Sequence, residues 1–230
     1  MNSLPKRTES SYSDYYTKNP VFIYHHLMKC GGTSVTRALQ NWFQIEFDSL
    51  EMSPGINTFI KKRYNLNAMN SDTCITGHFQ YDGINLFQRY PEICTSKNLK
   101  AFTIVREPIN LLTSLYYYVK SRGGYQGDSL EDALLHPDNF LAKLFPCTEE
   151  NYKEILDRYF FIGITERMQE SFNKLAVILN KRKIRIPFIN ISEKDSQISL
   201  LKENVVKEFK EKNKLDYMIY EYCLEKFNMI

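Results

Sequence analysis

A cation, two glycines and two hydroxyl residues follow one another at residues 29–34. They form a turn, KCGGTS, between the apolar run VFIYHHLM and the helix-like segment VTRALQNWF. A helix that begins after a glycine turn presents unpaired backbone N–H groups and the positive end of its dipole, and glycine lets the chain approach a phosphate closely. This pattern predicts a site for a ligand that carries a phosphate.

The residue order in this turn differs from the common signature of nucleoside-triphosphate loops. That signature has Gly, four spacers and then Gly-Lys-Ser/Thr, so that the lysine directly precedes the hydroxyl residue. Here Lys29 precedes the glycine pair, and its ammonium is expected to reach the outer group of the ligand from the strand end. Backbone and hydroxyl donors are expected from Gly31, Gly32, Thr33 and Ser34.

A second candidate phosphate contact lies in the segment FTIVREPINLLTSLYYYVK, which begins at residue 102. Arg106 closes an apolar run, and Pro108 stands where a first helical residue belongs, because proline lacks the N–H that is unpaired there. A guanidinium forks onto a phosphate with two hydrogen bonds, and the hydroxyl of Ser114, two turns into the following helix, can add a third.

Both segments resemble the PAPS-dependent sulfotransferases, where PAPS is 3′-phosphoadenosine 5′-phosphosulfate, most closely the group with the carbohydrate 2-O- and 6-O-sulfotransferases. The order His26-x-x-Lys29-Cys30-Gly31-Gly32-Thr33-Ser34 is similar to the family's 5′-phosphosulfate loop, and the second segment to its 3′-phosphate strand and helix. The stretches 160–179 and 189–222 are also similar. The resemblance implies a P-loop-like three-layer α/β fold with a mostly parallel central sheet, and PAPS as co-substrate. The residues it places at PAPS are Lys29, Cys30, Gly31, Gly32, Thr33, Ser34, Arg106 and Ser114.

Two positions need comment beside this resemblance. The family often carries an arginine three residues before the helix serine, whereas this chain has Leu111, so one contact to the nucleotide is missing or supplied elsewhere. Cys30 has two interpretations: a thiol whose pKa is lowered by Lys29 and the helix dipole, or a small residue that fills a tight turn. The family accepts Thr or Ala there, which favours the second.

Transfer of a sulfuryl group to an alcohol needs a base for the hydroxyl proton and cations for the departing phosphate. Lys29 is the candidate cation. His78, which ends the apolar run in CITGHFQYDG, is the candidate base, because neutral imidazole accepts a proton near pH 7 and a histidine at the corresponding strand end is the base in similar sulfotransferases. Its structural alternative is a strand-end histidine that caps a backbone group. His26 either orients the turn or helps the leaving group, and strand alternation points His25 to the opposite face.

The alternation of apolar runs and helical patterns predicts the elements that carry these residues. The predicted elements are strand 21–26, helix 33–43, strand 73–79, strand 100–106, helix 108–120, strand 160–166, helix 167–181, a short strand near 187–191 and two further helices. Such an order implies a mostly parallel sheet, whose ligands bind beyond the carboxyl ends of the strands. Lys29, His78, Arg106 and Glu166 all fall at such ends and are expected to share one rim.

The acceptor is expected to be a hydroxyl-bearing molecule, a carbohydrate or glycolipid. The stretch 44–72, with its basic triplet Lys61, Lys62 and Arg63, either lines the acceptor cleft or forms a solvated helix face. Of the tyrosines 116–118, at least one ring must point outward on a helix, where it can stack on a sugar, and two are expected in the core.

Composition agrees with one enzyme domain over residues 20–230, after a polar arm at 1–19 that is expected to be flexible. A net charge of +3 does not indicate a nucleic-acid binder. The sequence contains neither an apolar run of about 18 residues nor a signal-peptide pattern. We therefore expect a soluble, cytoplasmic microbial enzyme, with peripheral membrane association open. The five cysteines show no CxxC spacing, so no zinc site or complete disulfide framework is expected.

Two other classes of function remain as alternatives. A P-loop kinase of small molecules would need Mg²⁺ and the Gly-Lys-Ser/Thr turn, and Glu166 is the nearest substitute for its metal-binding aspartate. A catalytically silent module that binds a nucleotide or a glycan is the other alternative, which the leucine at 111 keeps open. The favoured mechanism requires no metal, and activity is expected to survive a chelator.

Overall fold

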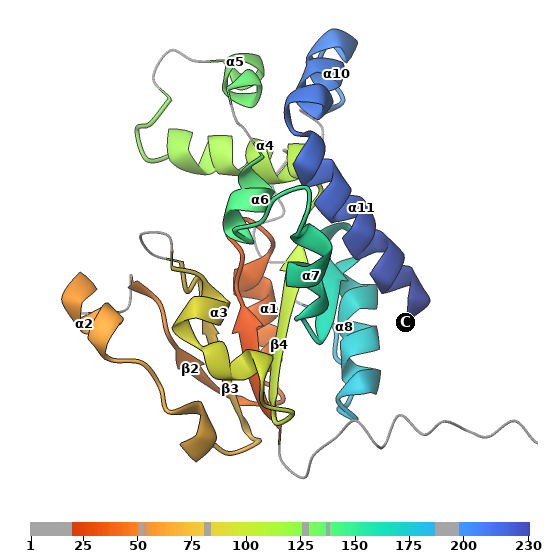
Figure 1. Ribbon diagram of the computed structural model, residues 1–230. Coiled ribbons are helices and arrows are strands. Elements are labelled where there is room, and N and C mark those ends of the chain that lie inside the picture. Colours follow the sequence, from red (N-terminus) through yellow and green to blue (C-terminus); the bar gives the residue numbers. More distant parts are fainter. Residues whose placement is uncertain are drawn as a thin grey trace, which may run out of the picture.

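Five short runs of the chain form the strands of one sheet in the computed structural model, which describes residues 20–50, 53, 55–80, 84–125, 129–136, 139–186 and 198–230 (Figure 1). The strands are β1 Val21–His25, β2 Gln44–Phe47, β3 Thr73–Gly77, β4 Leu99–Val105 and β5 Phe161–Ile164. The arm predicted for residues 1–19 and the short strand predicted near 187–191 lie outside the described residues.

Helices fill most of the segments between the strands, as the alternation in the sequence predicts. They are α1 Gly32–Leu39, α2 Ile56–Lys61, α3 Leu86–Arg89, α4 Pro108–Lys120, α5 Leu130–Leu135, α6 Phe140–Leu144, α7 Tyr152–Asp157, α8 Met168–Ile178, α10 Glu203–Lys212 and α11 Lys214–Met229. Short 3₁₀ turns are η3 Leu66–Ala68, η4 Pro91–Cys94 and η5 Thr165–Arg167. Both bounds predicted for α4 are confirmed, with Pro108 at its first position. Within the described residues, no helix has the length and apolar character needed to cross a bilayer.

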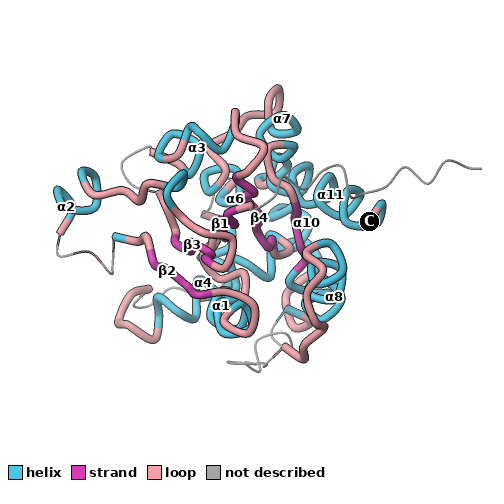
Figure 2. Tube along the Cα trace, turned by 90° about the horizontal axis from the view of Figure 1, so that it is seen from below, coloured by secondary structure: helices cyan, strands magenta, loops and turns pink. Residues whose placement is uncertain are grey.

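The described strands all pair in parallel, in the order β2-β3-β1-β4-β5. The central strand β1 lies between β3 and β4, with Ile23 opposite both Ile75 and Ala101. Figure 2 shows α3 and α7 on one face of the sheet and α1 and α8 on the other. The predicted fold class, a three-layer α/β fold with a parallel central sheet, is confirmed.

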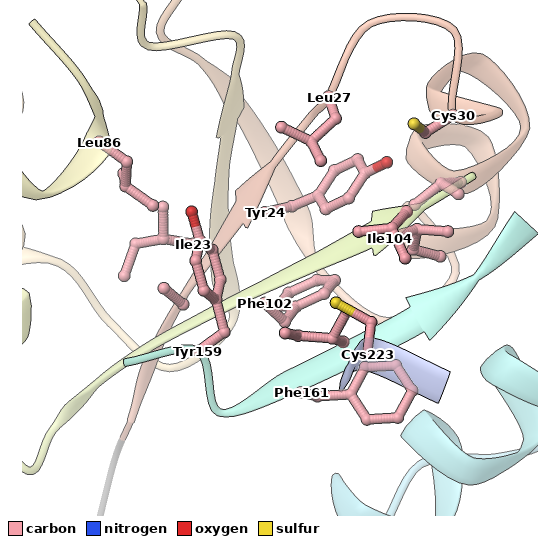
Figure 3. Packing of buried hydrophobic residues seen from close by; sticks show 14 of the residues in the cluster. Ile23, Tyr24, Leu27, Cys30, Leu86, Phe102, Ile104, Tyr159, Phe161 and Cys223 are labelled. Atoms are coloured by element: carbon pink, nitrogen blue, oxygen red, sulfur yellow. The ribbon is translucent and has the colours of Figure 1, made fainter. Parts of the chain in front are cut away.

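The core surrounds β1 and β4. All five residues of β1 are buried, because helices cover both faces of the strand, and such strands read as continuous apolar runs. Figure 3 shows Tyr24, Phe102 and Ile104 on one side of the sheet and Ile23 on the other, near Tyr159. Ile23, Tyr24, Phe102 and Ile104 are each 0% exposed. Burying a large apolar side chain stabilises a fold by about 1.5–3 kcal/mol. The loop that follows β1 therefore starts from a rigid strand.

The edge strand β2 is a difference from the prediction, which places no strand between residues 44 and 72. Its four residues, QIEF, are exposed or half-buried, so they give no strong periodic signal. They form a strand because β3 offers its free edge, with Gln44 opposite Thr73 and Phe47 opposite Thr76. The helix predicted over 33–43 is also shorter than expected, since α1 ends at Leu39.

Asp48, the residue after β2, ties this edge of the sheet to α3. Arg89 donates to both carboxylate oxygens of Asp48, at 2.6 and 2.7 Å, and the hydroxyl of Tyr90 donates to one of them at 2.7 Å. The side chains of Asp48 and Arg89 are each 5% exposed. Loss of one partner would leave the other charge buried and uncompensated.

We expect Asp48→Ala to lower the free energy of unfolding by about 3–5 kcal/mol, as for other broken buried ion pairs. The control is Glu92→Gln, which breaks the more exposed pair with Arg63 and should cost less than about 1 kcal/mol. Urea unfolding followed by circular dichroism measures both values. Equal losses in the two variants would contradict the anchoring role of Asp48.

Candidate active site

The loop between β1 and α1 turns sharply into the helix. Lys29 and Gly31 adopt left-handed backbone conformations, with φ of 61° and 78°. Gly31 is the N-cap of α1, and within the described residues no side chain caps this helix start and no acidic residue lies in its first turn. The positive end of the helix is therefore not neutralised by a carboxylate of its own first turn, which favours an anion there.

His26 fixes the distance between this loop and the helix. Its ring lies against Gly32, where a Cβ atom would stand 1.6 Å from the Nε2 atom of His26. Any other residue at position 32 would displace the imidazole. The ring of His26 also stacks on that of Tyr24, with centroids 5.7 Å apart. This supports the interpretation that His26 orients the turn.

His78 directly follows β3 and its ring lies beside that of His26, with centroids 4.5 Å apart. Its Nδ1 atom is 2.7 Å from the backbone carbonyl oxygen of His26. A carbonyl can only accept, so Nδ1 carries the proton and donates it, and in neutral His78 the lone pair is on Nε2. The predicted base thus has a defined tautomer, and only the ring of His26 lies between it and Gly32 at the start of α1.

The two other histidines of this cluster are held neutral. Burial first, and then the charge of His78, lower the pKa of His26 and of His25 to about 3. The ring of His25 lies on the other face of the sheet, where its Nδ1 is 2.6 Å from the hydroxyl of Tyr159. Its side chain is 1% exposed, on the face away from the loop, as strand alternation predicts.

Arg106 contacts the loop directly, because one of its terminal nitrogens donates to the carbonyl oxygen of Lys29 at 3.2 Å. The hydroxyl of Thr165, just after β5, lies 2.9 Å from the carbonyl oxygen of Val105 and 3.3 Å from that of Cys30. A Cβ on Gly31 would stand 2.7 Å from the terminal methyl of Met168. The loop is therefore braced from the β4 and β5 side as well as by His26.

Glu166 lies at the same rim, as predicted, with one oxygen 4.0 Å from Nε of Arg106. Its carboxylate accepts from the backbone N–H of Glu107 at 3.1 Å and from the hydroxyl of Tyr220 at 3.1 Å. A carboxylate at the N-terminus of α4 is stabilised by the helix dipole. Glu166 thus fastens α4 to the sheet, and the prediction that Lys29, His78, Arg106 and Glu166 fall at strand ends of one rim is confirmed.

Helix α4 lies beyond the carboxyl ends of the strands (Figure 1). Ser114 is 8% exposed, and Leu111, at the position of the family arginine, is 0% exposed within the core. Tyr116 is 3% exposed and Tyr118 is 37% exposed, so one ring is exposed as expected. Tyr117 is half-buried, so one of the three tyrosines, not two, lies in the core. The ammonium of Lys29 lies 4.1 Å from the centre of the Tyr118 ring.

Cys30 is the site residue whose two interpretations the structure separates. Its side chain is 0% exposed and lies near Leu27, Tyr24 and Ile104 (Figure 3). Burial raises the pKa of this thiol to about 12, so the interpretation as a reactive thiol of lowered pKa is wrong. Its backbone N–H points to the carbonyl oxygen of Leu27 at 3.4 Å. Cys30 fills the turn.

A pocket of about 380 Å³ lies at the carboxyl end of β2, within the stretch 44–72 that was expected to line an acceptor cleft. Its lining residues are Phe47, Asp48, Ser49, Ser53, Thr58, Phe59, Lys62, Arg63 and Tyr64. The backbone N–H of Asp48 donates to the carbonyl oxygen of Thr76, two residues before His78. Among the described residues, no three His, Cys, Asp or Glu side chains are grouped closely enough to hold a metal ion.

Comparisons with known proteins give structural neighbours alone, since no family model and no curated protein matches this chain. A sulfotransferase from Alicyclobacillus acidocaldarius is similar at 14% identity and a TM-score of 0.44, over 86% of this chain and 97% of that chain. A mouse sulfotransferase complexed with PAP is similar at 16% identity and a TM-score of 0.47, over 87% and 72%. At these values neither similarity decides the activity of this chain, which is argued below from its own residues.

The free energy of unfolding should decrease as the pH is lowered from about 6.5 to 3. In this range His25 and His26 take up protons when the chain unfolds but not while it is folded, because their pKa in the folded protein is about 3. Each such group adds at most about 1.4 kcal/mol per pH unit to the slope. We expect His26→Gln to reduce the slope of unfolding free energy against pH between pH 6 and 4. His136→Gln, which replaces an exposed histidine after α5, is the control and should leave the slope unchanged. An unaltered slope in His26→Gln would contradict the neutral, buried state of that ring.

Proposed function

We propose that this protein transfers a sulfuryl group from PAPS to a hydroxyl of a carbohydrate or glycolipid acceptor. The observation that carries the proposal is the position of His78. Its ring adjoins His26, which itself rests on the first residue of α1, and its Nδ1 is fixed as the donor. A base of defined tautomer thus lies beside a helix start suited to an anion.

The reaction assigns one task to each of three groups. Nε2 of His78 takes the proton of the acceptor hydroxyl as its oxygen attacks sulfur. The bond between sulfur and the bridging oxygen of the phosphosulfate breaks, and adenosine 3′,5′-bisphosphate leaves. Lys29 and the N–H groups at the start of α1 stabilise the charge that grows on the departing phosphate.

The nucleotide is proposed to lie along the rim, from the α1 loop to the α4 helix. Lys29, Gly31, Gly32, Thr33 and Ser34 would surround the 5′-phosphosulfate. Arg106 and Ser114 would bind the 3′-phosphate, for which the planar guanidinium provides two parallel donors. With Leu111 in the core, no third contact to that phosphate can come from its position.

The acceptor is proposed to enter through the pocket at the end of β2. Its wall combines the aromatic rings of Phe47 and Tyr64 with hydroxyls and the exposed Lys62. Arg63 is already engaged, since it donates to the carbonyl oxygen of Arg89 and to Glu92. Rings with a few polar groups suit sugars, and the pocket volume is within the usual range for small ligands.

We expect calorimetric titration to show binding of adenosine 3′,5′-bisphosphate in preference to ATP and 5′-AMP. Arg106→Ala should weaken that binding by about 10- to 100-fold, the value of hydrogen bonds to a charged group. Arg106→Lys should also weaken it, because an ammonium lacks the fork. The control is Arg158→Ala, which lies before β5 and so at the amino ends of the strands, whereas Arg106 follows the carboxyl end of β4. Equal or tighter binding of ATP would favour a kinase, and no binding would reject the proposal.

We expect His78→Asn to lower sulfuryl transfer from labelled PAPS by about 10²- to 10⁴-fold, the usual contribution of a general base. Affinity for adenosine 3′,5′-bisphosphate should change little. Lys29→Met should reduce turnover more than affinity, because its charge acts mainly as the bridging bond breaks. A panel of unsulfated oligosaccharides provides the acceptors, with and without EDTA. Loss of activity in EDTA that Mg²⁺ restores, or full activity of His78→Asn, would contradict this mechanism.

A further inference from the structure

One residue of α4, Tyr118, contacts the side chain of Lys29. Tyr118 is ten residues after the first residue of α4, which places it about 15 Å along the helix from the end that follows Arg106. It is also one turn after Ser114, and residues four apart share a face of a helix. The same face of α4 therefore carries the predicted phosphate ligand Ser114 and the ring that contacts Lys29.

Two cations share the ring of Tyr118. The ammonium of Lys29 lies 4.1 Å from the ring centre, and the central carbon of the Arg122 guanidinium lies 3.8 Å from it. Both distances are within the range of cation–π attraction. The two like charges repel each other, so each is held less tightly than it would be alone.

The backbone of Lys29 is fixed by its conformation and by one hydrogen bond. The residue is in the left-handed region with φ of 61°, and its carbonyl oxygen accepts from Arg106. The four-carbon stem of lysine is flexible, so the place of the ammonium depends on what attracts it. At a partly exposed ring this attraction is weak, whereas a phosphate in hydrogen-bond reach attracts an ammonium more strongly.

We propose that Tyr118 is a positioning residue for Lys29. Its ring holds the ammonium beside the loop in the unliganded protein, and the 5′-phosphate end of the nucleotide then draws the ammonium from the ring. Arg122 stays on the ring when Lys29 leaves, so the contact surface of Tyr118 remains covered by a cation. The second step rests on the proposed function, because it requires a nucleotide at the α1 loop.

The test uses the full chain with its lysines dimethylated by ¹³C-formaldehyde, which keeps their positive charge. The methyl resonance of Lys29 is the one missing in Lys29→Arg. We expect a ring-current shift of this resonance in the unsubstituted protein and in Tyr118→Phe, and no such shift in Tyr118→Leu. Tyr117→Leu, which removes the neighbouring ring of α4, should keep it. Adenosine 3′,5′-bisphosphate should abolish the shift as it binds.

Calorimetry provides the second readout. Tyr118→Leu should bind adenosine 3′,5′-bisphosphate about two- to fivefold more tightly, because the ring no longer competes for Lys29. Tyr118→Phe and Tyr117→Leu should match the unsubstituted protein. A shift that persists in Tyr118→Leu overturns the ring contact. A nucleotide that binds without altering the Lys29 resonance overturns the transfer of the ammonium alone, whereas absence of binding rejects the proposed function and the transfer together.

Discussion

The contact between the ring of His26 and the backbone of Gly32 is the constraint on which the rest of the site depends. The imidazole occupies the space where any other residue would carry its Cβ atom, so the ring that follows β1 packs directly on the backbone at the start of α1. The carbonyl group of the same histidine accepts the Nδ1 proton of His78. One residue therefore sets both the shape of the loop before α1 and the tautomer of His78.

The opposite side of the loop is fixed by a different set of contacts. Thr165, after β5, donates to the carbonyl oxygen of Cys30, and the terminal methyl of Met168 packs beside Gly31. Arg106, at the end of β4, donates to the carbonyl oxygen of Lys29. These residues follow strands that pair directly in the sheet, so their relative positions are set by main-chain hydrogen bonds. A loop held on both sides keeps its N–H groups oriented before a ligand arrives, which reduces the cost of ordering them on binding.

Sequence patterns were sufficient for the parts of the site that depend on strand ends. Lys29, His78 and Arg106 each follow a buried apolar run, and parallel pairing necessarily brings such ends to one rim. The patterns were insufficient where a contact joins distant segments through side chains. Nothing near Asp48 in the sequence indicates that Arg89 neutralises it, and the contact of Tyr118 with Lys29 requires that α4 cross above the loop. The strand β2 was missed for a similar reason, because β3 rather than its own four residues determines that it pairs.

The balance of charge at the rim follows from these same contacts. Burial keeps His25 and His26 neutral near pH 7, so they add no positive charge beside His78. Glu166, the carboxylate near Arg106, is engaged with the backbone of Glu107 and with Tyr220, and part of its charge is balanced by the α4 dipole. The rim therefore keeps a net positive charge, which comes from Lys29, Arg106 and the start of α1. This local excess of positive charge, rather than the net charge of +3, is what suits the rim to an anionic ligand.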